Sequence, residues 1–208
     1  MKSNSGKKPR SLTVILSVIV AAVIVVVFSV FVFVVRTTVI QLAEESYTNQ
    51  LLNFNKSIEQ QLVTFLDTQV RNAQFLAKNP SIVRAMKNND YSDAKIILKD
   101  FFEEGQVYEE VFISTPEQNS LIVASGANRS TGIRWGGIPV YRDNAAAAIK
   151  GEVHVGTVAK SPATGLPVIL VTVPIVAENR IIGILGLPLD VGKYSGNIVK
   201  NIVIGKTG

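Results

Sequence analysis

A single arginine stands where a glycine-rich loop gives way to a helical segment, and this position suits the binding of an anion. The loop covers residues 125–140, and the alanine-rich segment 144–150 follows Arg142, with Asp143 or Asn144 as its capping residue. The N-terminus of a helix presents unpaired N–H groups and a partial positive charge. A guanidinium beside it adds two parallel donors for a carboxylate. We therefore interpret Arg142 as a candidate ligand contact, with a surface cap as the alternative.

Trp135 is the only tryptophan of the chain and lies in a glycine-flanked part of the same loop. Its large, rigid ring suits a lid over a small ligand, and a plug in the core is the alternative. Arg134, directly before it, is either a second donor for an anion or a solvated charge. Thr164 is either a polar contact or a residue that shapes a hairpin turn. The remaining candidate contacts are Tyr141, Asn144 and Asp190.

The sequence contains no arrangement typical of a catalytic or metal site. The Gly-Lys-Thr at 205–207 lacks the upstream glycine of a phosphate-binding loop, and neither GxSxG nor HExxH occurs. His154 has no obvious partner, and the acidic pairs at 103–104 and 109–110 are interpreted as solvated. Without cysteine there are no disulfides and no thiolate chemistry, and one histidine and two methionines leave little material for a transition metal. We therefore predict no enzyme activity and no cofactor.

Residues 12–35 form a long apolar run without a charged residue, glycine or proline. As a helix that rises about 1.5 Å per residue, this run is longer than the roughly 30 Å hydrocarbon core of a bilayer. It is too long for the apolar part of a typical signal peptide, and no small-residue cleavage site follows it. We therefore predict a retained transmembrane helix.

The charges around this run predict its orientation. Basic side chains crowd the preceding tail, 1–11, and no acidic residue occurs before Glu44. Lysine and arginine beside a span favour the cytoplasmic side, so the chain beyond Arg36 lies in the periplasm or outside the cell. Because the tail carries most of the net charge of +5, the basic balance indicates topology and not nucleic-acid binding. These features are typical of a protein of the bacterial inner membrane.

The segment 37–78 has apolar residues at steps of three and four, which predicts a helix. A helix of about 40 residues without glycine or proline is far longer than the average in globular proteins. Core packing alone does not need this length, so we predict a stalk that forms a homodimer through the helix. Asn79-Pro80 ends it, because the residue before a proline is pushed out of the α region.

The remainder alternates between short helices and strands. We expect helices at 81–87, 94–104, 144–150 and 191–199, and strands at 107–114, 121–124, 153–158, 167–176, 180–187 and from 202 onward. The predicted fold class is α+β. It combines an N-terminal transmembrane helix, a long stalk helix and an antiparallel five-stranded sheet with flanking helices, in a PAS-like order.

Three phrases resemble, in order and spacing, the extracytoplasmic double Cache sensor domains of bacterial methyl-accepting chemotaxis receptors and sensor kinases. Residues 141–151, YRDNAAAAIKG, are similar to the R-P-Y-F…A-L-x-G helix of that family. Residues 161–168, SPATGLPV, are similar to its S…T-G-x-P-V hairpin. Residues 202–208, IVIGKTG, are similar to the I-x-I-G-K-T-G-Y phrase that opens its second, membrane-proximal module.

This resemblance implies a division of the chain into five parts. They are a cytoplasmic tail, a transmembrane helix, a stalk and dimerisation helix, a membrane-distal Cache sensor module and the start of a membrane-proximal module: 1–11, 12–35, 37–78, 79–200 and 201–208. In the family a second PAS-like module, a second span and a cytoplasmic signalling region follow. We therefore expect this chain to be an N-terminal fragment of a longer receptor.

In amino-acid-binding members of the family, the arginine that matches Arg142 grips the carboxylate of the ligand. Asn144 and Ala145 stand where that pattern has aromatic residues. Pro188 stands where an aspartate holds the amino group of the ligand, and Asp190 follows two residues later. The resemblance therefore implies a different ligand, a carboxylate or another anion, or a site that a partner protein recognises.

For the whole chain, the resemblance implies the ligand-sensing domain of a transmembrane chemoreceptor that binds a small molecule and signals across the membrane. The sensor domain of a histidine kinase or of a cyclic-nucleotide enzyme is the alternative, because these proteins differ in the region that follows the sensor. A non-sensory, membrane-anchored interaction protein is the third interpretation.

Overall fold

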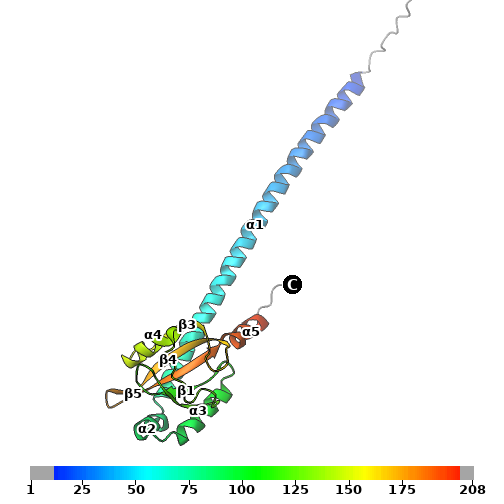
Figure 1. Cartoon of the computed structure of the whole chain (residues 1–208). Coiled ribbons are helices and arrows are strands. Elements are labelled where there is room, and N and C mark those ends of the chain that lie inside the picture. Colours follow the sequence, from blue (N-terminus) through cyan, green and yellow to red (C-terminus); the bar gives the residue numbers. More distant parts are fainter. Residues whose placement is uncertain (1–11, 202–208) are drawn as a thin grey trace, which may run out of the picture. The chain divides into compact units, whose positions relative to one another are not determined.

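The computed structural model describes residues 12–201 of the chain, without the side chains of residues 12, 13, 15, 40–46, 48 and 197–201 (Figure 1). The chain divides into two compact units, Met1–Gln61 and Leu62–Gly208. The described part of the first unit is helix, and the second unit holds the sheet. The strand predicted from residue 202 lies outside the described residues.

Helix α1, Leu12–Ala77, contains both the predicted transmembrane segment and the predicted long helix, and it continues through Arg36 without interruption. Its segment Leu16–Val39 is long and apolar enough to cross a membrane, and its side chains are exposed. Within it, the hydroxyl of Ser29 donates a hydrogen bond of 2.7 Å to the carbonyl of Val25. Such a bond satisfies the hydroxyl within its own helix.

Two short helices follow, α2 at Pro80–Asn88 and α3 at Ser92–Glu104, close to the predicted bounds. Asn79 caps α2, because its side-chain oxygen accepts a hydrogen bond of 2.9 Å from the N–H of Ser81. Proline takes the first position of α2, where its missing N–H is not needed. Local sequence therefore determines the break after α1.

The sheet has five strands in the order β2-β1-β5-β4-β3, and every neighbouring pair is antiparallel. The strands are β1 Phe112–Ser114, β2 Ile122–Ser125, β3 His154–Lys160, β4 Pro167–Ala177 and β5 Arg180–Asp190. Strands β4 and β5 form a hairpin whose turn residues Glu178 and Asn179 have φ of 51° and 58°. Positive φ at both positions is what a tight hairpin turn requires. The predicted α+β class with an antiparallel five-stranded sheet is confirmed.

Strand β1 is shorter than predicted. Of the expected strand 107–114, Tyr108 forms only an isolated bridge to β5. The carboxylate of Glu110 accepts the N–H of Val111 at 3.0 Å, and the carbonyl of Val111 accepts the N–H of Gly126 at 2.8 Å. These partners replace the ladder, so regular pairing begins at Phe112.

Each face of the sheet has its own core, because successive strand residues point to opposite faces. On the first face, the strands pack against α2, α3 and the last turns of α1. The second face is covered by the loop 126–138, by the 3-10 turn η1, Pro139–Tyr141, and by α4, Arg142–Ile149 (Figure 1). Residues that are neighbours in sequence therefore lie in different cores. The first core contains Ile113, Val171 and Leu185, and the second contains the residues before them, Phe112, Leu170 and Ile184.

A fifth α-helix, α5 at Val191–Asn201, follows β5 directly. Its Tyr194 stacks on Phe65 of α1, with ring centroids 4.0 Å apart. The bounds agree with the helix predicted at 191–199. The last part of α1 thus contacts both the sheet and α5.

Candidate functional site

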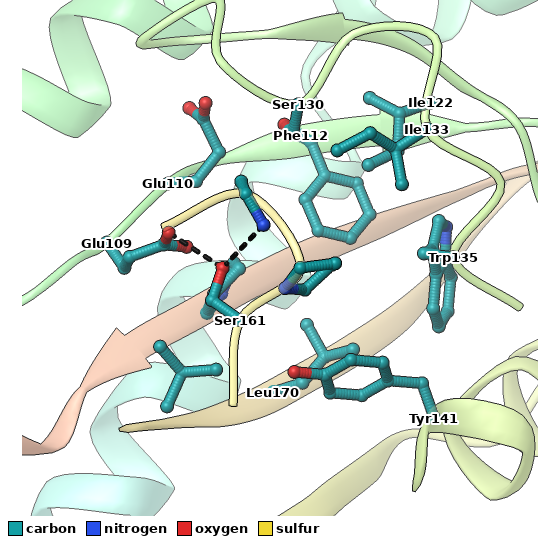
Figure 2. Close-up of a pocket in the computed structure, with 14 residues that line it drawn as sticks. Glu109, Glu110, Phe112, Ile122, Ser130, Ile133, Trp135, Tyr141, Ser161 and Leu170 are labelled. Carbon is teal, nitrogen blue, oxygen red and sulfur yellow. Dashed lines mark hydrogen bonds between the residues drawn. The ribbon is translucent and has the colours of Figure 1, made fainter. Parts of the chain in front are cut away.

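A cavity lies on the second face of the sheet, between the strands and the covering loops (Figure 2). Its volume of about 30 Å³ is room for two or three water molecules at most, since one water needs about 10–15 Å³ on this measure. Phe112, Trp135 and Tyr141 form an aromatic wall, and Glu109 and Glu110 contribute the charged groups. Aliphatic side chains make up much of the remainder. Among residues 12–201, no group of three or more metal-binding side chains lies together.

Two buried polar atoms at this cavity have no hydrogen-bond partner, Trp135 Nε1 and Ser130 Oγ. An unpaired buried donor costs about 1–3 kcal/mol, which a polar ligand atom or water would recover. Within the described chain, no other buried side-chain nitrogen or oxygen lacks a partner. A second hollow, of about 270 Å³ beside Gln74, Lys78 and Val176, contains no such atom. The first cavity is therefore the better candidate for a ligand site.

Trp135 is placed by tight packing on its neighbours. Its ring centroid lies 5.6 Å from that of Phe112, and the ring planes are tilted by 59°. Gly136 allows this placement, because a Cβ there would collide with the backbone carbonyl of Gln118. Gly186 of β5 lies opposite Phe112 and leaves room for the phenyl ring. Because Trp135 is 2% exposed, it forms an inner wall of the cavity and not a lid over an open site.

Tyr141 closes another part of the wall at the start of α4. Its hydroxyl donates a hydrogen bond of 2.9 Å to the carbonyl of Lys160 at the end of β3. Burial and, to a smaller extent, the charge of Glu109 raise the pKa of the phenol. The charge of Glu109 therefore acts on the phenol that lines the same cavity.

Glu109 is 4% exposed and is held by the turn 161–166 between β3 and β4. Its Oε1 accepts a hydrogen bond of 2.8 Å from Ser161 Oγ and one of 2.7 Å from Thr164 Oγ1. Ser161 Oγ in turn accepts a hydrogen bond of 3.2 Å from the N–H of Ala163 (Figure 2). Because its lone pair is used in this way, the hydroxyl proton of Ser161 points to the Glu109 carboxylate. The turn thus fixes the Glu109 carboxylate at the wall of the cavity.

Glu110 is 1% exposed and has a different role. Its Oε1 accepts the N–H groups of Val111 at 3.0 Å and Ala127 at 2.7 Å, and its Oε2 accepts that of Arg129 at 3.2 Å. Three backbone donors therefore satisfy its charge and anchor the covering loop. The prediction that the acidic pair 109–110 is solvated is wrong, because both side chains are buried and both accept hydrogen bonds from protein donors.

The structure brings some of the predicted site residues together and separates the others. Trp135 and Tyr141 line the cavity, and Thr164 is bonded to Glu109 behind its wall. Arg134 and Arg142 are exposed and do not belong to the lining. The cavity thus contains the predicted aromatic residues but not the predicted anion donors.

The interpretation of residues 143 and 144 as helix caps is wrong. Helix α4 begins already at Arg142, because the 3-10 turn Pro139–Tyr141 runs directly into it, and no side chain caps it. Asp143 is exposed in the first turn, whereas Asn144 is 1% exposed. The amide of Asn144 donates a hydrogen bond of 2.9 Å to the carbonyl of Leu170. Asn144 therefore ties α4 to β4.

Asp190 is the last residue of β5 and is buried. Its Oδ1 accepts the N–H of Lys193 at 3.0 Å, in the first turn of α5. The side chain therefore stabilises the start of that helix, and it does not line the cavity.

The sequence-based reasoning missed several residues of the site, among them Phe112, Ser161 and Glu109. Phe112 lies in a predicted strand, but the pattern does not tell which face borders a cavity. Ser161 lies in the hairpin turn and was not considered as a contact of the site. Glu109 carried a signal, because an acidic pair inside the apolar run 107–113 is unusual for a solvated position.

No protein-family model and no curated protein matches the sequence. Among solved structures, the sensor domain of the V. cholerae histidine kinase DctB aligns with a TM-score of 0.53 and 18% identity, over 65% of this chain and 52% of that chain. The ligand-binding domain of the Campylobacter jejuni chemoreceptor Tlp3, in complex with 4-methylisoleucine, aligns with a TM-score of 0.51 and 16% identity. This alignment covers 67% of this chain and 56% of that chain. The ligand-binding domain of the Pseudomonas fluorescens chemoreceptor CtaA, in complex with L-alanine, aligns with a TM-score of 0.54 and 13% identity. This alignment covers 71% of this chain and 61% of that chain.

These neighbours are sensor and ligand-binding domains, not catalytic ones. This chain therefore shares its fold with these domains. More closely, the shared fold is the Cache-type fold of chemoreceptors and histidine kinases, which confirms the fold implied by the sequence phrases. The chain spans between 52% and 61% of the length of these solved domains.

Proposed function

We propose that this chain is the ligand-sensing part of a transmembrane chemoreceptor and that it binds a small molecule in the cavity beside Glu109 and Trp135. The observation that carries the proposal is the pair of buried atoms without partners, Trp135 Nε1 and Ser130 Oγ, at this cavity. The fold supports it, because the Tlp3 and CtaA domains hold 4-methylisoleucine and L-alanine. A volume of about 30 Å³ is too small for an organic ligand, so binding requires the covering loops to move outward.

In this proposal, ligand binding reaches α1 through a short path. Tyr108 directly precedes Glu109, and its hydroxyl is hydrogen-bonded to Gln69 of α1. A ligand that shifts the Glu109 carboxylate therefore acts on a segment that contacts α1. The ligand biases the packing of this helix, and the shift in population is the signal.

Helix α1 is the proposed anchor and dimer contact. The apolar segment Leu16–Val39 supports a membrane span, and the basic tail supports a cytoplasmic N-terminus, with residues 79–200 as a sensor module in the periplasm or outside the cell. Leu51, Leu52 and Phe54 are exposed apolar side chains, which supports a homodimer through this part of the helix. The proposed location is the inner membrane of a bacterium.

The sensor domain of a histidine kinase is the second candidate, because the TM-score of the DctB sensor domain, 0.53, lies between those of the Tlp3 and CtaA domains, 0.51 and 0.54. A deletion strain separates the two outputs. Loss of the swimming response to a compound that binds the chain supports the chemoreceptor. An unchanged swimming response with altered protein phosphorylation supports the kinase.

Fluorescence of the only tryptophan tests the proposal without a label, because Trp135 lines the cavity. The full chain in lipid nanodiscs is titrated with the L-amino acids, with C4 dicarboxylates and with aliphatic amines. We expect at least one compound to shift the Trp135 emission in a saturable manner and to raise the melting temperature. If no compound of the three panels changes either quantity, the proposed function is contradicted.

A pair of matched variants links binding to the cavity. Ala163 lines it, so Ala163→Leu should fill the space and abolish the emission change. Ala146 is exposed on α4, and Ala146→Leu adds the same side chain outside the cavity. Loss of binding in the first variant alone supports the site, and retained binding in both assigns the ligand to another surface.

A further inference from the structure

The charged side chains that line the cavity are acidic. Among the lining residues that the structure describes, Glu109 and Glu110 carry charge, and lysine, arginine and histidine are absent. Neither carboxylate belongs to an ion pair formed within the described chain. Both are at least nine-tenths buried, at 4% and 1% exposure. The cavity therefore carries negative charge without a counter-ion from the described protein.

The two carboxylates differ in how far their charge is already satisfied. Glu110 uses both oxygens to accept three backbone N–H groups. Glu109 accepts hydrogen bonds only from two neutral hydroxyls, both at Oε1, and its Oε2, which is not among the fully buried atoms, accepts none from the described residues. A buried carboxylate gains most from a partner that is positively charged. Oε2 of Glu109 is thus the position at which a cationic group would be bound best.

The remaining wall suits the body of an organic cation. Phe112, Trp135 and Tyr141 present aromatic rings, whose faces attract ammonium groups, and Leu170 adds apolar surface. Figure 2 shows Glu109 and Trp135 on opposite sides of the cavity, with Phe112 between them in this view. The unpaired Trp135 Nε1 therefore offers a hydrogen bond to an oxygen atom at the far end of such a ligand.

From these observations we infer that the cavity recognises a small organic ammonium ion without a carboxylate. Its ammonium group is bound at Glu109 Oε2, its apolar body lies against the rings, and a hydroxyl or carbonyl oxygen accepts from Trp135 Nε1. This inference rests on the proposed function and adds the class of ligand. It departs from the expected anion, because Arg134 and Arg142 lie outside the cavity.

Four compounds of closely related shape test the ligand class. L-Valinol has an ammonium group, an isopropyl group and a hydroxyl, and isobutylamine lacks only the hydroxymethyl group. L-Valine carries a carboxylate in place of that group, and isobutanol replaces the ammonium of isobutylamine with a neutral hydroxyl. Each is titrated into the full chain in nanodiscs, with Trp135 emission and melting temperature as the two readouts.

We expect L-valinol and isobutylamine to bind, with L-valinol the tighter. Isobutanol should bind roughly tenfold or more weakly than isobutylamine, because it leaves Glu109 without a cation. L-Valine should bind roughly tenfold or more weakly than L-valinol, because its carboxylate meets two acidic side chains and no base. These comparisons need no variant of the protein.

Glu109→Gln tests the residue. The amide keeps the shape and one oxygen that can accept from Ser161 and Thr164, and it removes the charge. The affinity for isobutylamine should fall roughly tenfold or more. Glu152→Gln is the matched control, because Glu152 is exposed on the turn after α4 and outside the lining. Melting temperatures show whether each variant is folded.

The outcomes separate this inference from the proposed function. Binding of isobutylamine and L-valinol that is lost in Glu109→Gln and kept in Glu152→Gln supports both. Binding of L-valine or of a C4 dicarboxylate without binding of the amines overturns the ligand class and leaves the sensor function standing. Equal affinity of wild type and Glu109→Gln for isobutylamine overturns the role of Glu109. If no probe of any class binds, both fail.

Discussion

The hydroxyl of Tyr108 donates a hydrogen bond of 2.7 Å to Oε1 of Gln69, and both side chains are buried. The ring of Tyr108 also stacks on Phe101 of α3, with 5.1 Å between the ring centroids. Burial raises the pKa of this phenol, so it stays protonated and able to donate. The bond joins the segment that carries Glu109 to helix α1.

Removal of this hydroxyl should destabilise the protein. Tyr108→Phe leaves Gln69 Oε1 buried without its donor, which should lower the free energy of unfolding by about 1–3 kcal/mol. Tyr91→Phe is the control, because the hydroxyl of Tyr91 meets Asn89 at 3.1 Å in an exposed setting, and it should cost less than about 0.5 kcal/mol. Urea unfolding of the full chain in micelles, followed by Trp135 emission, measures both. Equal losses in the two variants would show that burial of the bond has no effect.

A methyl group beside Trp135 should open the cavity. In Gly136→Ala the new Cβ collides with the backbone carbonyl of Gln118, which cannot move aside as a side chain would. We expect a loss of about 1–3 kcal/mol and a red shift of the Trp135 emission as its ring becomes exposed to water. In Gly137→Ala the Cβ meets only the side chain of Asn119, at 3.3 Å, so stability and emission should stay close to wild type. An unshifted emission in Gly136→Ala would show that Trp135 does not depend on this close approach.

Asn144 should matter for stability, and Arg142 should not. The pairing of β3 with β4 shifts register between Val155 and Val158, and the Asn144 amide donates to the carbonyl of Leu170 at this irregularity. Asn144→Ala should therefore cost about 1–3 kcal/mol in thermal or urea unfolding. Arg142→Ala removes an exposed side chain and should change stability by less than about 0.5 kcal/mol.

The same two variants test the position of the site. Because Arg142 does not line the cavity, Arg142→Ala should bind every compound that wild type binds, with the same affinity. A loss of affinity in Arg142→Ala, without a change in melting temperature, would show that Arg142 contacts the ligand.

The stability of the protein should decrease in alkaline solution. Burial and the charge of Glu109 raise the pKa of the Tyr141 phenol, so the folded protein holds this proton more tightly than the unfolded chain. This contribution is complete below the unfolded pKa of about 10 and is lost as the pH rises through the higher folded pKa. The free energy of unfolding should therefore decline above about pH 10, and less steeply in Tyr141→Phe.

Glu109→Gln separates the two causes of this shift. Removal of the charge should lower the pKa of the Tyr141 phenol, and burial should keep it above that of a free tyrosine. The ultraviolet absorbance of the phenolate measures the titration, and the difference from Tyr141→Phe isolates this residue from the other tyrosines. An unchanged titration in Glu109→Gln would contradict an interaction of the two groups.

The elements of the fold could be predicted from the sequence because their signals are local. The Asn79-Pro80 break and the turn before Arg180 each determine a boundary within a few residues. The length of β1 could not be predicted, because the N–H of Val111 is taken by the side chain of its neighbour and its carbonyl by Gly126. Propensity does not reveal such a competition.

The site was only partly predictable, because its polar contacts join distant segments. Residue type and loop context point to Trp135 and Tyr141 as candidate contacts, and both line the cavity. Glu109 looks solvated until the turn 161–166 supplies its two hydroxyl donors. Arg142 looks like an anion donor because it lies near a helix start, but its side chain is exposed in the structure.

Tyr108 and Glu109 are neighbours on the chain, yet the first contacts α1 and the second borders the cavity. The proposed contact with the ligand and the proposed contact that passes the signal to α1 thus belong to two separate side chains. A substitution at position 109, or in the turn 161–166 that holds it, could therefore change the ligand that is bound. The hydrogen bond between Tyr108 and Gln69 would be retained. The proposed ligand could therefore change without a change in the contact between Tyr108 and α1.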